Sequence, residues 1–215
     1  MSRFVVRAFF CTLAFSICLF ALPRVSVGQT LFGTHPQKPA NSNTKSEPTI
    51  PEGTNVIYSN FGPGYSYDCC DGWDEFAGYP VAMAFTPTKA SYLLLQIHFV
   101  MVYFRGTNSM TMQLCADNDG VPGKVLASWR VRNLPQYMEE PYLYPIQTLK
   151  APSPIELGQG QQYWLVPLPD PGAELGWNGN YDDIGGNIAF SDDNGATWET
   201  EYYWNGAFDV LGVPY

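Results

Sequence analysis

The segment MTMQL, residues 110–114, decides the fold, because its apolar and polar side chains alternate. Met110, Met112 and Leu114 point to one side of an extended chain, and the polar residues between them point to the other. The segment VLASWRV, residues 125–131, repeats this alternation. A period of two residues predicts β-strands with one buried face.

Similar segments recur after Gly53 at short intervals, with Pro and Gly between them. We expect the other strands at 55–59, 81–86, 91–103 (two strands, or one with a bend), 142–149, 161–168, 187–191, 196–200 and 207–211. No segment after Gly53 carries apolar residues at helical spacing for several turns. The sequence therefore predicts an all-β domain over residues 54–215, an antiparallel, jelly-roll-like β-sandwich of about nine or ten short strands.

The N-terminus has the layout of a secretory signal peptide. Arg3 and Arg7 precede an apolar run at 8–22, and Ser26 and Gly28 are small residues at the expected cleavage site before Gln29. An uncleaved membrane anchor is the alternative, but the run is short for a membrane span. We expect residues 1–28 to be removed and the mature protein, with no membrane span, to be secreted, periplasmic or at the cell surface.

The segment 29–53 is rich in Pro, Ser, Thr and Asn and nearly lacks apolar residues. Such a composition cannot bury enough surface to offset chain entropy, so we expect a disordered linker.

The chain is acidic, with 11 Lys plus Arg against 20 Asp plus Glu and a formal net charge of −9. The expected signal removes Arg3, Arg7 and Arg24 and no acid, which leaves 8 − 20 = −12. A protein this negative repels phosphate backbones and anionic headgroups, so nucleic acids and membrane surfaces are excluded as expected partners.

Three cysteines, Cys69, Cys70 and Cys115, follow the expected signal. Adjacent cysteines can bond only through a small strained ring, so we expect Cys115 to pair with Cys69 or Cys70. A buried free thiol at Cys115 is the alternative. Zinc is not expected, because His35 and His98 are isolated from this group.

The segment FSDDNGATWE, residues 190–199, contains a turn with the spacing S-x-D-x-G-x-T-W. Its members are Ser191, Asp193, Gly195, Thr197 and Trp198. The pattern resembles the Asp-box, a hairpin signature of sialidases and other propeller proteins. One copy predicts a structural hairpin, in which the aspartate accepts backbone hydrogen bonds and glycine takes a positive φ.

A second turn carries Asp117, Asn118 and Asp119 before Gly120. Oxygen ligands at this spacing make a weak calcium candidate, although the EF-hand loop is not completed. The alternative is a metal-free hairpin turn, for which Asp-Gly is a signal. No other cofactor is expected.

Several segments together resemble the secreted bacterial β-sandwich domains called choice-of-anchor domains. They are NVIYSNFGPG at 55–64, CADNDGVPGKVL at 115–126, YWLV at 163–166, the Asp-box-like turn, and GAFDVLG at 206–212. The resemblance implies export and a β-sandwich, and it implies no enzymatic activity.

Aromatic residues gather near the C-terminus among Asn and Asp side chains. The candidates are Trp177, Tyr181, Tyr202 and Trp204. Sugar rings stack on aromatic faces while amides and carboxylates bind their hydroxyls, so this mixture indicates glycan recognition. The alternative is that these rings fill the core and loop corners of the sandwich.

No motif of a catalytic serine elbow, a zinc protease or a phosphate loop occurs. We therefore expect an exported, non-catalytic interaction module that binds glycans or is associated with the cell surface, with a glycan or an extracellular protein as its partner. One alternative is a polysaccharide hydrolase that uses two loop carboxylates, and another is a structural subunit of an extracellular layer. The acids available for the hydrolase are Asp68, Asp71, Asp74, Glu75, Asp182, Asp183, Glu199 and Glu201.

Overall fold

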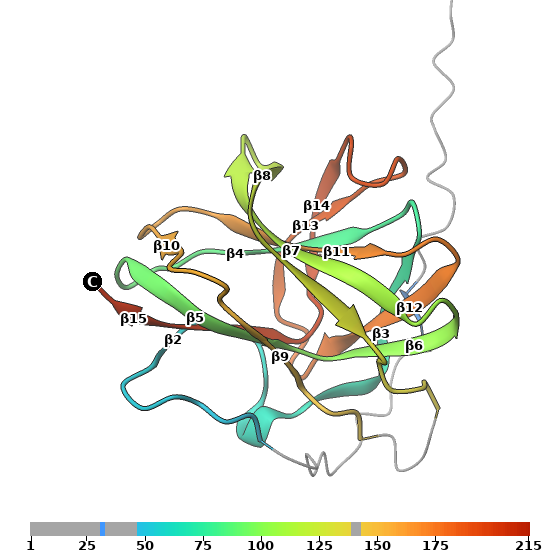
Figure 1. Cartoon of the computed structure of the whole chain (residues 1–215), viewed down its shortest axis with the longest axis horizontal. Coiled ribbons are helices and arrows are strands. Elements are labelled where there is room, and N and C mark those ends of the chain that lie inside the picture. Colours follow the sequence, from blue (N-terminus) through green and yellow to red (C-terminus); the bar gives the residue numbers. More distant parts are fainter. Residues whose placement is uncertain (1–30, 33–46, 139–142) are drawn as a thin grey trace, which may run out of the picture.

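The computed structural model describes residues 31–32, 47–138 and 143–215 (Figure 1). The expected signal peptide and most of the expected linker lie outside these residues. Within the expected linker the structure describes β1 (Leu31–Phe32), which pairs with Trp73 and Gly72. No helix among the described residues has the length and apolarity needed to cross a membrane.

One layer of the protein is a six-stranded antiparallel sheet in the order β14-β13-β4-β11-β7-β8. Its strands are β4 (Val81–Phe85), β7 (Ser109–Asn118), β8 (Val121–Arg132), β11 (Tyr163–Pro169), β13 (Gly185–Phe190) and β14 (Glu199–Trp204). The segment 110–114 lies in β7, and its alternation is confirmed: Met110, Met112 and Leu114 are fully buried.

The second layer consists of two smaller sheets. The first contains β1, β3 (Tyr67–Phe76), β12 (Ala173–Asn180) and β6 (Met101–Gly106). The second contains β10 (Glu156–Leu157), β5 (Tyr92–Phe99), β15 (Phe208–Pro214) and β2 (Asn55–Ser59), with β9 (Gln147–Lys150) beside β5. The two sheets meet at Val100, which accepts the Asn178 N–H and donates its own N–H to Ala207.

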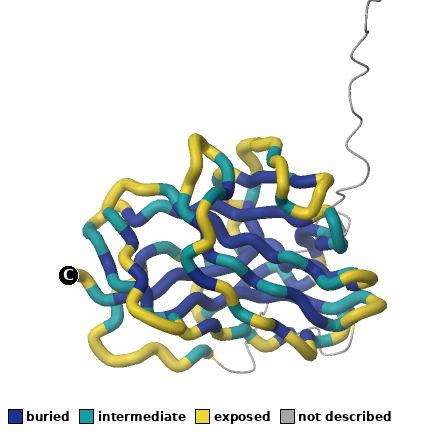
Figure 2. The backbone as a smooth tube through the Cα atoms, turned by 45° about the horizontal axis from the view of Figure 1, so that its top comes forward, coloured by how far each residue is buried: buried dark blue, intermediate teal, exposed yellow. Residues whose placement is uncertain are grey.

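A single large apolar cluster separates the two layers, and it contains side chains from all three sheets. Its largest fully buried members include Trp177, Phe99, Phe208 and Met83. The buried strands run through the middle of the molecule and the exposed chain forms the connecting loops (Figure 2). The predicted antiparallel β-sandwich is thus confirmed.

The structure has more strands than the nine or ten expected, and their labels run to β15. The expected strand at 91–103 is two strands, β5 and β6. Of the described part of the expected strand at 142–149, residues 143–146 are not strand and 147–149 belong to β9. The sequence pattern also missed β3 and β12, which are rich in Asp, Asn and Gly. These residue types are depleted in strands, but here the buried amide of Asn178 donates to the backbone carbonyl of Cys69 at 2.9 Å.

Candidate functional site

The Asp-box-like turn joins β13 to β14 and is held by its own side chains. Ser191 Oγ accepts the Gly195 N–H at 2.7 Å and donates to Asp193 Oδ1 at 2.9 Å. Thr197 donates its hydroxyl and its backbone N–H to the two Asp193 oxygens, and these bonds lower the pKa of Asp193 to about 2. Gly195 has a φ of 87°, as the turn requires. These hydrogen bonds hold the turn together, which is the local structural role that the motif predicted.

The turn with Asp117 closes the β7–β8 hairpin. Asp119 and Gly120 have φ values of 57° and 86°, the geometry of a two-residue hairpin turn. Asp117 Oδ2 accepts the Gly120 N–H, and Oδ1 accepts from the side chains of Gln162 and Trp164. Protein donors thus occupy the carboxylate that the calcium hypothesis needs. The described residues contain no group of three His, Cys, Asp or Glu side chains that could hold a metal.

Trp177 is not part of a surface, which corrects its assignment to a glycan site. Its side chain is fully buried in the core, where the ring packs against Phe99 and Phe208. The indole N–H donates to the Ala207 carbonyl at 3.1 Å. Trp177 lies opposite Trp73 on β3, so its strand position turns it toward the opposing layer and away from solvent.

Two other predicted aromatics are partly covered. Trp204 is half-buried against Trp73, with ring centroids 5.4 Å apart. Tyr181 lies against Gly62, where an added β-carbon would come within 2.5 Å of its ring. Sugar stacking needs a ring with a free face. Both of these rings are less exposed than that of the fourth candidate, Tyr202.

Tyr202 is the exposed aromatic of the group, with 71% of its surface accessible. It lies on β14 opposite Asn187 of β13, so both side chains project from the same face of the sheet. A β-carbon added at Gly185 would come within 2.7 Å of the Tyr202 ring. The ring therefore rests on bare glycine backbone and presents its other side to solvent.

This face is the outer face of the six-stranded sheet. Ala82, Ala84 and Ala189 on it are buried in a small cluster beneath Trp164 and Trp198. Small alanines allow these two indoles to lie on the sheet. Trp198, just before β14, remains half-exposed and packs against this cluster on the outer face.

A row of polar side chains crosses the same face. Asn187 Nδ2 donates to Gln162 Oε1 at 2.8 Å, and Gln162 Nε2 donates to Asp117 Oδ1 at 2.8 Å. Partial burial acts to raise the pKa of Asp117, but its hydrogen bonds from Gly120, Trp164 and Gln162 lower it below the usual value. The row therefore carries a fixed negative charge at one end and an exposed amide, Asn187, at the other.

A groove of about 140 Å³ lies on this face between the two turns. The Asp-box-like turn contributes Gly195 and Trp198 to its lining, and the β7–β8 hairpin contributes Pro122 and Val125. Figure 1 shows both hairpins rising at the same end of the molecule. We name Tyr202, Asn187, Gln162, Trp198 and this groove the outer-face site.

The cysteine pairing differs from the prediction. Cys69 is bonded to its neighbour Cys70, and Cys115 is a free, buried thiol. Cys115 projects from β7 into the cluster on the outer face of the six-stranded sheet, whereas Cys69 projects from β3 into a cluster on the outside of the other layer. The whole core lies between the two clusters, so Cys115 cannot reach either partner.

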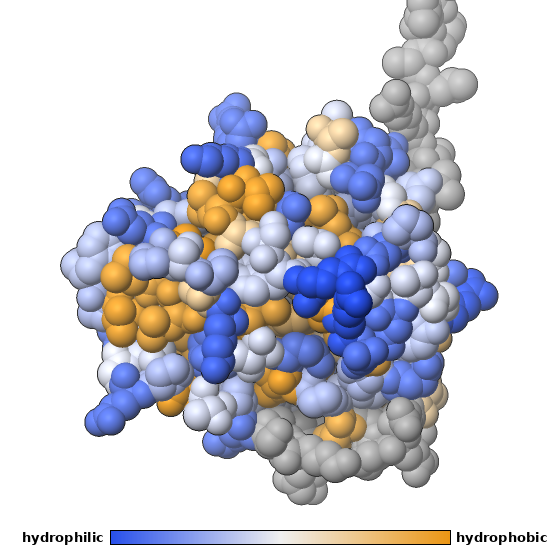
Figure 3. All heavy atoms as spheres, in the orientation of Figure 1, coloured by the Kyte–Doolittle hydropathy of each residue, from blue (hydrophilic) through white to orange (hydrophobic). Residues whose placement is uncertain are grey.

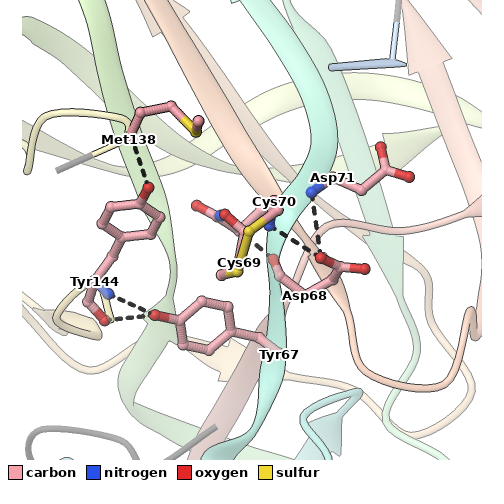
Figure 4. Close-up of a disulfide and its surroundings, with 8 residues drawn as sticks. Tyr67, Asp68, Cys69, Cys70, Asp71, Met138 and Tyr144 are labelled. Carbon is pink, nitrogen blue, oxygen red and sulfur yellow. Dashed lines mark hydrogen bonds between the residues drawn. A yellow bond between two sulfur atoms is a disulfide. The ribbon is translucent and has the colours of Figure 1, made fainter. Parts of the chain in front are cut away.

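The Cys69–Cys70 bond sits in a large bulge of β3 (Figure 4). Tyr67 pairs with Asn180 and Gly72 pairs with Asn178, so four residues of β3 stand opposite one residue of β12. Asp68 Oδ1 accepts the backbone N–H groups of Cys70 and Asp71. The sequence showed the adjacent cysteines, but the bulge that makes their bond possible comes from pairing with β12.

A loop after β8 packs beside this bulge through two tyrosines. Tyr67 Oη donates to the Tyr144 carbonyl at 2.8 Å and accepts the Tyr144 N–H at 2.7 Å, and Tyr144 Oη accepts the Met138 N–H (Figure 4). These bonds fix the end of the loop to β3. Cys69 and Tyr144 belong to the same buried cluster.

Peptide mapping without reduction is expected to recover Cys69 and Cys70 in one peptide that lacks two hydrogen atoms. Cys115 should react with an alkylating reagent only after unfolding, because it is 2% exposed and burial raises its thiol pKa to about 11. A Cys115→Ala variant should leave the Cys69–Cys70 peptide unchanged. A cross-linked peptide that contains Cys115 would contradict the assignment.

No protein-family model, curated protein or solved structure matches this chain. Function is therefore inferred from the geometry of the chain itself.

Proposed function

We propose that this protein is an exported, non-catalytic binding module that recognises a glycan on its outer-face site. The single observation that supports the proposal most strongly is Tyr202, a ring supported by Gly185 on one side and 71% exposed. Such a ring can stack on a sugar without any rearrangement, and it loses little side-chain entropy on binding.

The polar groups beside Tyr202 supply what a sugar ring needs at its edge. Asn187 has donated to Gln162 and still offers its carbonyl oxygen to a sugar hydroxyl. Because Gln162 and Asp117 hold this amide in place, it is oriented before a ligand arrives. Trp198 and the groove continue the face along the sheet, which favours a short oligosaccharide over a single sugar.

The hydrolase alternative requires two carboxyl groups facing a substrate in a cleft. Burial raises the pKa of Glu75 well above its usual value, as a general acid would need. However, Glu75 is fully buried and its Oε2 accepts the Val81 N–H. It therefore cannot approach a polysaccharide, and the binding module is the better supported function.

Tyr202→Ala is expected to weaken glycan binding by about tenfold, since loss of an exposed aromatic anchor costs roughly 1–2 kcal/mol. A glycan array with the protein would find the ligand, and titration calorimetry would measure the change. Tyr202→Phe keeps the ring and should bind nearly as wild type. Tyr215→Ala is the matched control, because Tyr215 is 62% exposed at the end of the chain beyond β15 in the other layer.

Two outcomes would refute the proposal. In one, wild type binds no glycan on the array. In the other, Tyr202→Ala binds as tightly as wild type while its thermal unfolding is unchanged. A structural role in an extracellular layer would then become the leading alternative.

A further inference from the structure

A second pocket, on the opposite layer, has no part in the outer-face site. Its volume is about 320 Å³, at the small end of the range for ligand pockets. The side chains that line it are Glu47, Val56, Ser59, Phe61, Tyr65 and Asp209. The remaining lining is the backbone of Gly62 and Gly64, next to the short turn η1 (Pro63–Tyr65). We call it the η1 pocket.

The floor of the η1 pocket is a buried carboxylate with a fixed partner. Asp209 is 1% exposed, and its Oδ1 lies 2.9 Å from Nδ1 of the fully buried His98. Gln96 Nε2 lies 2.9 Å from His98 Nε2 and also donates to the Thr49 carbonyl, which orients the amide. With the Gln96 amide as donor, His98 Nε2 is the acceptor, which places the ring proton on Nδ1, 2.9 Å from Asp209 Oδ1.

Asp209 is the acidic group at this floor, and its Oδ1 also accepts the backbone N–H of His98 at 3.3 Å. Tyr65 adds no charge of its own. Burial is the largest cause that raises the pKa of the Tyr65 hydroxyl. The charge of Asp209 and a hydrogen bond to Asp209 raise this pKa further, so the hydroxyl stays protonated. Glu47 brings a second carboxylate at the exposed end of the pocket. The described residues of the lining include no Lys or Arg.

Aromatic and apolar groups form the walls between the two carboxylates. The rings of Phe61 and Tyr65 lie 5.3 Å apart and are tilted by 55° to each other. Tyr65 also contacts His98 edge-on, with centroids 6.0 Å apart. Aromatic faces attract cations, and carboxylates accept charged N–H donors at short distance. The described residues contain no group of three His, Cys, Asp or Glu side chains that could hold a metal ion, and this lining has two carboxylates.

From the buried Asp209, the aromatic walls and the acidic rim, we propose that the η1 pocket binds a primary alkylammonium group. The ammonium would lie between Asp209 and Glu47, and its aliphatic arm would contact Val56 and Phe61. A small amine and a lysine side chain share this chemistry. The site is independent of the glycan site, which lies on the outer face of the other layer.

The test is a titration of the protein with n-butylammonium chloride, followed by NMR shifts of the amides of Phe61, Gly62 and Tyr65. We expect saturable shifts at these positions, and at least tenfold weaker binding of n-butanol, which has the same arm without the charge. A titration with N-acetyl-lysine methylamide then distinguishes a lysine side chain from a small amine, because only an open pocket admits the bulkier residue.

Variants make the assignment specific. Glu47→Gln should weaken n-butylammonium binding about threefold, as expected for an exposed ion pair, and Asp209→Asn should weaken it at least tenfold. Glu199→Gln, an exposed change on β14 of the other layer, should bind as wild type. Asp209→Asn disturbs a buried pair, so the thermal unfolding of this variant is measured as well. If the variant does not fold, the Glu47→Gln variant and the n-butanol titration test the proposal.

The proposal is overturned if n-butanol binds as tightly as n-butylammonium, if Glu47→Gln has no effect, or if no saturable shift occurs at the η1 pocket. The His98–Asp209 pair would then serve only to join β5 to β15.

Discussion

Trp177→Ala is expected to destabilise the protein by about 3–5 kcal/mol, the usual cost of removing a fully buried tryptophan. The indole lies between Phe99 and Phe208 at the junction of the two small sheets. Its packing leaves no room nearby, since a β-carbon at Gly206 would come within 2.4 Å of the ring. Alanine would leave a cavity and would also leave the Ala207 carbonyl without the indole N–H.

Urea denaturation followed by tryptophan fluorescence and circular dichroism would measure this loss. Tyr202→Ala is the matched control, because it removes an exposed aromatic and should change stability by less than about 1 kcal/mol. A loss below about 1 kcal/mol for Trp177→Ala would contradict its central place in the core. The comparison also matters for function, since a binding defect in Trp177→Ala would report unfolding and not a lost sugar contact.

Glu75→Gln is expected to remove most of the fall in stability that the wild-type protein shows as the pH rises above 5. Glu75 Oε2 accepts the Val81 N–H at 3.0 Å, and Oε1 has no hydrogen-bond partner among the described residues. Burial raises the pKa of this carboxyl well above its usual value of 4.5, while the Val81 bond lowers it and the charge of Asp74 raises it. The folded protein therefore holds the Glu75 proton more tightly than the unfolded chain does.

The sign of the effect follows from this difference in proton binding. The contribution of Glu75 to stability is fully present below the unfolded pKa and declines as pH rises toward the folded pKa. Within this window the free energy of unfolding falls by up to about 1.4 kcal/mol per pH unit. Glutamine keeps an oxygen for Val81 and cannot ionise. The variant should therefore be more stable than wild type at pH 8, with a flatter profile.

Urea unfolding at intervals from pH 4 to pH 9 would test this expectation. Glu156→Gln, an exposed change on β10, should keep the wild-type profile. If Glu75→Gln shows the same decline with pH as wild type, Glu75 is not the group responsible.

On the face seen in Figure 3, apolar side chains form patches at the left and near the top, and strongly polar side chains gather at the right. These patches by themselves do not identify a binding site. Exposed single apolar residues such as Val125, at 44%, are ordinary for a folded protein. The outer-face site is therefore defined by the glycine backbone that supports Tyr202 and by the polar groups beside it.

The sequence by itself determined the fold class and the turns, because both depend on neighbours in the chain. Alternation at 110–114 assigned Met110 and Thr111 to opposite faces of β7, and S-x-D-x-G-x-T-W placed Asp193 within reach of Thr197. These signals need no knowledge of distant residues. They predicted a β-sandwich and a self-contained hairpin, and both are present.

Tertiary structure alone decided the partners of Trp177, the cysteines and Asp209. Two layers separate Cys115 from Cys69, and the pairing of β3 with β12 creates the bulge in which Cys69 bonds to Cys70. The same pairing turns Trp177 into the core, although its sequence neighbours are polar. Burial and long-range contacts depend on which strands meet across the sandwich. A local pattern of residues does not determine which strands these are.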